Sequence, residues 1–216
     1  MIAKKIIKKV IALSLLTVSM LGKHESIGAS DTSSLFNESE ITRKLAENAA
    51  NSEVVSDKCA INSVATRSTI TGTYPTRKGV ILVTADAYKN IIPTGHAAIV
   101  VNSSQVIESL SDGVQYGNSN WYSTKKTCYG VTCSSTSVNQ DACTVNRIEQ
   151  QGYIGLPYNY NYLNVNTRSK FYCSHLVWAA YIDALGIDLN TDEYGAAVHP
   201  LELVASSRTV TIYSKE

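Results

Sequence analysis

The stretch Phe171-Tyr-Cys-Ser-His-Leu-Val-Trp-Ala-Ala-Tyr-Ile-Asp-Ala-Leu-Gly186 decides the fold of this chain. Its small and apolar residues recur at the spacing of one helical face, and Gly186 supplies a left-handed stop. The face consists of Cys173, Val177, Ala180 and Ala184. The pattern predicts an amphipathic helix of about four turns, with Cys173 in the first turn. Free backbone N–H groups and the helix dipole favour a thiolate there, although a buried cysteine with no chemical role has the same pattern.

The beginning of the chain has the pattern of a secretory signal peptide. Residues 1–9 are basic, residues 10–21 are apolar, and Ile27-Gly28-Ala29 ends in a small residue of the kind that precedes a cleavage site. The apolar run is shorter than the roughly 20 residues that span a bilayer. We therefore expect a signal peptide over residues 1–29 and a secreted, extracellular product that is not embedded in a membrane. It would be released or held at the cell surface or cell wall.

The remaining residues fit one domain preceded by a polar arm. The 216-residue chain has a formal net charge of +1, which argues against a nucleic-acid partner. Residues 30–68 are polar, with one helix expected near residues 39–49 and no assigned chemistry. Residues 69–216 are the predicted domain, and we expect a monomer. Further helices are predicted near residues 141–152 and 201–206, with a closing strand at 209–213.

The cysteine count adds a second argument about Cys173. Five cysteines in a secreted chain leave one thiol unpaired, and Cys173 is the candidate for it. The others are then predicted to form two disulfides, in any of three pairings: Cys59, Cys128, Cys133 and Cys143. Zinc is the rival interpretation, but the paired short spacings and histidines of a structural zinc site are missing. No metal or organic cofactor is predicted.

The residues from about 117 to 143 form a cysteine-containing insertion that is rich in small polar residues. We expect a disulfide-pinned loop or hairpin near the functional site. Its aromatic pair, Trp121 and Tyr122, has two interpretations: one wall of a substrate groove, or ordinary packing.

A β-hairpin is predicted over residues 93–110. It follows the continuous apolar run 79–84, which is typical of a buried strand, and it turns at residues 102–104. That turn pairs Ala98 with Glu108 and puts His96 and Glu108 on the same face as diagonal neighbours. A slip of one residue would separate them. Taken singly, each also fits a structural role, as a strand-edge histidine or a solvated carboxylate.

Together, Cys173, His96 and Glu108 match the chemistry of a thiol nucleophile. Such a nucleophile needs a base to accept its proton, and the base needs a third group to orient its ring. His175 follows Cys173 by two residues, about 200° around the helix, so its ring is expected to point away from the sulfur. His199 precedes a proline and is the second candidate for the base.

Four motifs in order carry a family resemblance: Gly95-His-Ala-Ala-Ile-Val, Val106-Ile-Glu-Ser, Gly155-Leu-Pro-Tyr-Asn and Phe171-Tyr-Cys-Ser-His-Leu-Val. Together they resemble the circularly permuted papain-like cysteine hydrolases, the YiiX-like branch of the NlpC-type cell-wall amidases. In the ordinary arrangement the cysteine helix precedes the histidine strand, whereas here it follows. The resemblance covers nearly everything from about residue 69 to residue 213.

This resemblance implies an α+β fold, with a small, mainly antiparallel sheet packed on a central helix that carries the nucleophilic cysteine. It implies Cys173 as nucleophile, His96 as base and Glu108 as the orienting residue. Tyr158 and Tyr172 are assigned to substrate binding. Two positions depart from the family pattern, because His175 replaces a longer polar residue and Val80 stands where aspartate is frequent.

The expected function is a secreted cysteine hydrolase that cleaves amide bonds through a thioester, with cell-wall peptides as the leading substrate class. One alternative keeps the fold and acts on fatty-acyl amides or lipids, by hydrolysis or acyl transfer. Another is a secreted binding module that has lost its activity.

Overall fold

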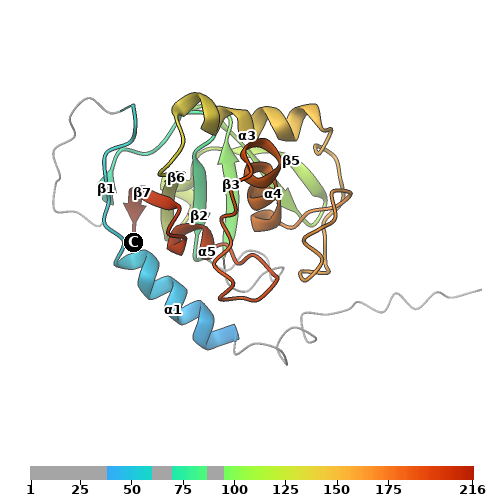
Figure 1. Ribbon diagram of the computed structural model, residues 1–216. Helices are drawn as coiled ribbons and strands as arrows, with labels where there is room; N and C mark the ends of the chain where they lie inside the picture. The colour runs from blue at the N-terminus through green and yellow to red at the C-terminus, as the bar shows by residue number, and fades with distance from the viewer. Residues whose placement is uncertain (1–37, 60–69, 87–94) are drawn as a thin grey trace, which may run out of the picture.

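In the described part of the chain, seven strands form one antiparallel sheet in the order β1-β7-β6-β2-β3-β4-β5 (Figure 1). The computed structural model describes residues 38–59, 70–86 and 95–216, so the predicted signal peptide lies outside the described residues. The strands are β1 (Ile70–Gly72), β2 (Ile81–Thr84), β3 (His96–Val100), β4 (Gln105–Leu110), β5 (Gly113–Asn118), β6 (Cys128–Cys133) and β7 (Thr209–Lys215). The helices are α1 (Glu38–Ala50), α2 (Trp121–Thr124), α3 (Val138–Gln150), α4 (Cys173–Leu185) and α5 (Glu202–Ala205). The α+β prediction is confirmed.

Both faces of the sheet are buried in its middle. The residues of β2 and β3 are all buried, and successive side chains along a strand point to opposite faces. On one face, the larger hydrophobic cluster joins the sheet to α4 through residues that include Ile99, Ile107, Leu176 and Ala180. On the other face, a smaller cluster contains Leu82, Ala98, Val106 and Trp121. Figure 1 shows α3 and α4 together, with α4 packed on β3 and β4.

Helix α4 begins at Cys173, as the sequence pattern predicts, and Gly186 ends it. Gly186 adopts φ 67°, and its N–H donates to the Ile182 carbonyl at 2.9 Å. Almost all side chains of the first half of α4 are buried, so the helix is less amphipathic than expected. The reason is that α3 and the loop of residues 159–170 also pack on α4, besides the sheet. His175 Nε2 donates to the Val165 carbonyl at 2.8 Å, and Arg168 Nε contacts Asp183 Oδ2 at 2.7 Å.

Strand β6 corrects the disulfide prediction. All five cysteines are free in the described structure, and every residue of β6 is buried between β7 and β2. Cys128 packs in the smaller cluster and Cys133 in the larger one, so the two sulfurs lie on opposite faces of the sheet. The prediction of two disulfides is therefore wrong for this structure. Cys128 and Cys133 act as small hydrophobic residues of a central strand, rather than as pins of a loop.

The predicted N-terminal arm contributes to the core. Helix α1 covers residues 38–50, close to the predicted 39–49, and packs against α5. Leu45 and Ala49 are buried in the larger cluster, which places the apolar stripe of α1 in the packing of the domain. Val54 then bridges to Thr211 of β7.

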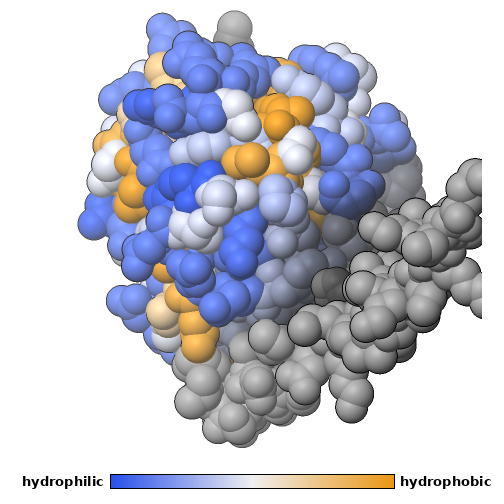
Figure 2. Space-filling model, turned by 90° about the vertical axis from the view of Figure 1, so that its right-hand side faces the viewer, coloured by the Kyte–Doolittle hydropathy of each residue, from blue (hydrophilic) through white to orange (hydrophobic). Residues whose placement is uncertain are grey.

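Figure 2 shows one face of the molecule, on which hydrophilic residues predominate and hydrophobic residues form small separate patches. Among the described residues, Tyr160 and Leu163 are exposed large hydrophobic side chains of the loop that precedes α4, at 55% and 40% exposure. Within the described ranges, no helix has both the length and the apolar character needed to cross a bilayer.

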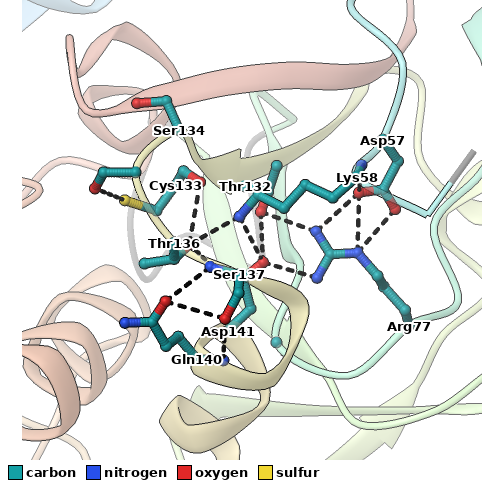
Figure 3. Close-up of polar contacts among 12 residues, drawn as sticks. Asp57, Lys58, Arg77, Thr132, Cys133, Ser134, Thr136, Ser137, Gln140 and Asp141 are labelled. Carbon is teal, nitrogen blue, oxygen red and sulfur yellow. Dashed lines mark hydrogen bonds and ion pairs between the residues drawn. The ribbon is translucent and has the colours of Figure 1, made fainter.

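A buried charge network fastens the end of the arm to α3 (Figure 3). Asp141 is fully buried and accepts from Arg77 Nη1 at 2.8 Å, Lys58 Nζ at 3.0 Å and Thr132 Oγ1 at 2.8 Å. Arg77 also binds Asp57. Because each charge has an opposite partner and hydrogen bonds, the network holds residues 57–58 against the domain without leaving a bare buried charge.

Replacing Asp141 tests this network. Asp141→Ala leaves Arg77 and Lys58 without their shared partner, so we expect it to lower the free energy of unfolding by about 3–5 kcal/mol. Urea unfolding followed by circular dichroism measures the change. Arg43→Ala is the control, since it removes an exposed ion pair with Glu47 and should cost less than about 1 kcal/mol. Equal losses for the two variants would show that the network contributes no more than a surface pair.

Candidate active site

The predicted hairpin register brings His96 and Glu108 together. Ala98 pairs with Glu108, as the turn at residues 102–104 requires, and this register prediction is confirmed. His96 Nε2 lies 2.7 Å from Glu108 Oε2, and both side chains are largely buried. With Nε2 turned to the carboxylate, Nδ1 is the ring nitrogen left for a further partner.

Ala98–Glu108 is the last pair of β3 and β4 on the side away from the turn. The chain that leads into α4 approaches the hairpin just beyond this pair. Ser109, one residue beyond Glu108, donates its hydroxyl to the Phe171 carbonyl at 2.7 Å. The backbone N–H of Ala97 is directed to the Cys173 sulfur. Cys173 thereby reaches His96 at the open end of the hairpin, and the side chains of His96 and Cys173 form a hydrogen bond.

The surroundings of Cys173 favour its thiolate. Burial by itself would raise the pKa of the Cys173 thiol, because it removes water from the charged form. The charge and hydrogen bond of His96 act in the opposite direction, and the backbone N–H groups of Ala97 and Ser174 add to them. The net result is a lowered pKa for Cys173, as expected at a helix N-terminus beside a cationic imidazole.

His96 responds in the complementary way. Burial would lower the pKa of His96, but the neighbouring Cys173 thiolate, its hydrogen bond and the Glu108 carboxylate raise that pKa to about 9. The opposite directions of the two pKa shifts favour a thiolate–imidazolium pair over a neutral thiol and imidazole. The two groups titrate as a coupled unit, since each charge stabilises the other.

Tyr158 lies beside this pair. The segment of residues 157–159 runs along Phe171, with hydrogen bonds of 3.0 and 3.1 Å between their backbones and a bridge from Tyr158 to Phe171. The Tyr158 ring is 5% exposed, and Tyr160 packs against it with ring centroids 4.9 Å apart. Burial and then the Cys173 charge raise the pKa of Tyr158 well above its usual value, so the phenol stays protonated beside the sulfur.

Tyr172, the other residue predicted to bind substrate, lies buried just before α4. Its residue surface is 1% exposed, and its hydroxyl forms hydrogen bonds with two backbone groups. The hydroxyl donates to the Tyr162 carbonyl at 3.2 Å and accepts the Val198 N–H at 2.9 Å. Through these two hydrogen bonds Tyr172 braces the start of α4 against two loops.

The two other histidines of the described chain lie in different surroundings. The imidazole of His175 points at Val165, away from the sulfur, as its position on the helix predicts. His199 Nδ1 accepts the Leu201 N–H at 3.1 Å, and its ring packs on Tyr194. Burial lowers the pKa of His175 to about 4 and that of His199 to about 3. Such weak bases are poorly matched to proton transfer near neutral pH, so His199 is a poor second candidate.

The structure distinguishes the two interpretations of the aromatic pair in the insertion. Trp121 is 3% exposed and stacks on His96, with ring centroids 5.4 Å apart and an interplanar angle of 27°. Trp121 therefore fits the packing interpretation, and the side chain on which it packs is the His96 imidazole. Tyr122 is 51% exposed and packs edge-on against Tyr74. Val80, one of the two departures from the family pattern, is a fully buried residue of the smaller cluster.

Sequence reasoning missed the groups that join the two halves of the site. Ala97 and Ser109 both lie within the quoted motifs, but the motifs do not indicate their contacts, since the Ala97 N–H and the Ser109 hydroxyl each act on a segment far along the chain. The signals for Ser109 are its place at the end of the motif Val106-Ile-Glu-Ser and its polar side chain inside a predicted strand, next to Glu108. Trp121 was visible as an aromatic residue, but nothing local indicates which side chain it contacts.

Comparison with known proteins adds independent evidence. Residues 80–199 match the family described as permuted papain-like amidase enzymes, YaeF/YiiX, which is more than half of the chain. The chain belongs to this family. The matched region contains the whole hairpin and all of α4, and with them Cys173, His96 and Glu108. This assignment makes the protein a member of an amidase enzyme family with a papain-like fold.

Two relatives illustrate the range of similarity. The uncharacterized protein YycO of Bacillus subtilis (strain 168) is 29% identical over 141 residues, which cover 62% of this chain and 55% of that protein. The crystal structure of metalloprotein yiiX from Escherichia coli O157:H7 has a TM-score of 0.52 at 18% identity. It covers 65% of this chain and 98% of that one, a likeness of fold alone. Within residues 38–59, 70–86 and 95–216 there is no cluster of three or more His, Cys, Asp or Glu side chains suited to a metal ion.

The charge pair predicts how the alkylation rate of Cys173 depends on pH. We expect iodoacetamide, a small reagent suited to a covered sulfur, to alkylate Cys173 already below pH 9, the usual pKa of a thiol, because the pair holds the thiolate. In His96→Ala the rate near pH 7 should fall by roughly tenfold for each unit that the thiol pKa rises.

Site-resolved mass spectrometry measures this reaction, with the exposed Cys59 and Cys143 as references within the same sample. Identical pH profiles for Cys173 in the wild type and in His96→Ala would contradict the charge pair.

Proposed function

We propose that this protein is a cysteine amidase in which Cys173 is the nucleophile, His96 the general base and acid, and Glu108 the residue that orients His96. One observation carries the proposal: the buried contact between Cys173 and His96, with Glu108 Oε2 2.7 Å from the second ring nitrogen. A nucleophile, a base in contact with it and a carboxylate on the far side of that base are the parts that acyl transfer requires.

In this mechanism the Cys173 thiolate attacks the amide carbonyl and forms a tetrahedral intermediate. The His96 imidazolium gives its proton to the leaving amine as the C–N bond breaks, which leaves a thioester on Cys173. Neutral His96 then takes a proton from water, whose oxygen attacks the thioester. Collapse releases the carboxylic acid and restores the thiolate and the imidazolium, so the cycle needs no external proton source beyond water.

The start of α4 supports stabilisation of the oxyanion. The first N–H groups of a helix have no partner within the helix, and the helix dipole favours negative charge beside them. The N–H groups of Ser174 and Ala97 are directed to the sulfur, whereas the N–H of Cys173 itself is the donor proposed for the carbonyl oxygen. The thiolate and the oxyanion would then both lie at the positive, N-terminal end of the α4 dipole.

The proposed substrates are peptides of the bacterial cell wall, either stem peptides or their crosslinks. A peptide-like substrate agrees with the amidase family, and the narrower choice rests on the resemblance to cell-wall amidases and on the predicted secretion. The extracellular location rests on the sequence of residues 1–29. We propose that the protein acts as a monomer.

Hydrolysis of purified peptidoglycan tests this function, with released peptides identified by mass spectrometry. We expect Cys173→Ala to lower turnover by at least about 10³-fold and His96→Ala by roughly 10²–10⁴-fold. Turnover should also fall as pH rises past about 9, because His96 then lacks the proton that the leaving amine needs.

Two results would lead to a different function. Turnover of acyl amides that grows with acyl-chain length, with no release of peptides, would support the lipid alternative. The exposed apolar side chains Tyr160, which packs on Tyr158, and Leu163 of the same loop suit it. No turnover of either class, with a Cys173 that reacts no faster than the exposed cysteines, would support the inactive binding module.

A further inference from the structure

Gly117 leaves the space in which the Glu108 carboxylate lies. In the β4–β5 register Gly117 pairs with Val106, which puts it diagonally across from Glu108 on the same face of the sheet. A Cβ atom added to Gly117 would lie 1.9 Å from Glu108 Oε1 and 2.8 Å from its Cδ. Gly117 has no left-handed φ, so the backbone would accept alanine, and the three nearest atoms to the added Cβ all belong to the Glu108 side chain.

Trp121, four residues further along, covers the imidazole that this carboxylate binds. Its ring stacks on His96 and is almost fully buried, so the indole limits both the rotation of His96 and the access of water to that face. A hydrogen bond also holds Trp121 in place, since the backbone N–H of Trp121 donates to Tyr74 Oη at 3.3 Å. Tyr74 is packed against Tyr213 of β7, with ring centroids 5.2 Å apart.

We propose that Gly117 and Trp121 are positioning residues for the His96–Glu108 pair, acting through these two side chains rather than on the substrate. The inference rests on the proposed function, because it concerns the orientation of the proposed base. The Glu108 carboxylate is the far end of a flexible side chain, so it can swing away from an added methyl group at little cost to folding. That movement would break the 2.7 Å contact with Nε2 and leave the ring without its orienting partner.

The first test is Gly117→Ala, measured by the pH profile of Cys173 alkylation and by thermal unfolding. A displaced carboxylate weakens the positive charge on His96, so we expect the apparent thiol pKa to rise and alkylation near pH 7 to slow by roughly tenfold per unit. The melting temperature should change little. Tyr116→Ala is the matched control, because Tyr116 is the preceding residue on β5 and points to the opposite face.

A compensating variant separates displacement from general damage. Glu108→Asp withdraws the carboxylate from the Gly117 side, so it removes the atoms that an added Cβ would meet. We expect Glu108→Asp to slow alkylation by itself, and Gly117→Ala to cause much less additional loss in that background than in the wild type. This non-additivity is the signature of two residues that act on each other. Equal losses in both backgrounds would overturn the role of Gly117.

Trp121 is tested by two replacements. Trp121→Phe keeps an aromatic ring over His96 and should retain most of the alkylation rate. Trp121→Ala leaves the imidazole free to turn away from Cys173 and Glu108, and this loss of the charge pair should raise the apparent pKa of the Cys173 thiol. The inference would be refuted if Trp121→Ala and Gly117→Ala both fold and both show the same pH profile of Cys173 alkylation as the wild type.

The same measurement distinguishes failure of the inference from failure of the proposed function. If His96→Ala and Glu108→Gln shift the Cys173 profile while the Gly117 and Trp121 variants do not, only the positioning roles are lost. If none of the four shifts it, the proposed catalytic group itself is wrong.

Discussion

The contact between Cys173 and His96 is the interaction on which the site depends. Two buried groups that exchange a proton are stable as an ion pair only when hydrogen bonds replace the lost water. Here the Glu108 carboxylate serves the imidazole, and the N–H groups of Ala97 and Ser174 serve the sulfur. These groups come from the start of β3, from β4 and from the start of α4, so the chemistry depends on how those three elements meet.

The sheet separates the two halves of the proposed site. Helix α4 packs on the face of the larger cluster, while His96 and Glu108 point to the other face, where Trp121 covers the ring. The groups meet because β3 and β4 pair only up to Ala98–Glu108, which leaves the end of the hairpin open. The Ser109–Phe171 hydrogen bond then ties β4 to the segment that leads into α4, beside that opening.

The departure from the family pattern at position 175 has a structural consequence. His175 holds the loop of residues 159–170 through the Val165 carbonyl, and Arg168 adds its pair with Asp183 of α4. That loop carries Tyr160 and Leu163, both exposed, and it starts next to Tyr158 beside the sulfur. A histidine next to the nucleophile thus contributes to the shape of the neighbouring surface, without sharing in the proposed proton transfer.

The sequence by itself determined the local features: the α4 helix with Cys173 at its start, the hairpin register that faces His96 toward Glu108, and the order of motifs that marks the permuted family. These follow from periodicity and turn length, which act between residues close along the chain. Only the tertiary structure decided that Cys128 and Cys133 are core residues of a central strand, that Tyr172 is a buried brace, and that Trp121 covers His96. Each of these depends on packing between segments far apart in sequence, and a residue's own type and neighbours carry no record of which distant side chain will meet it.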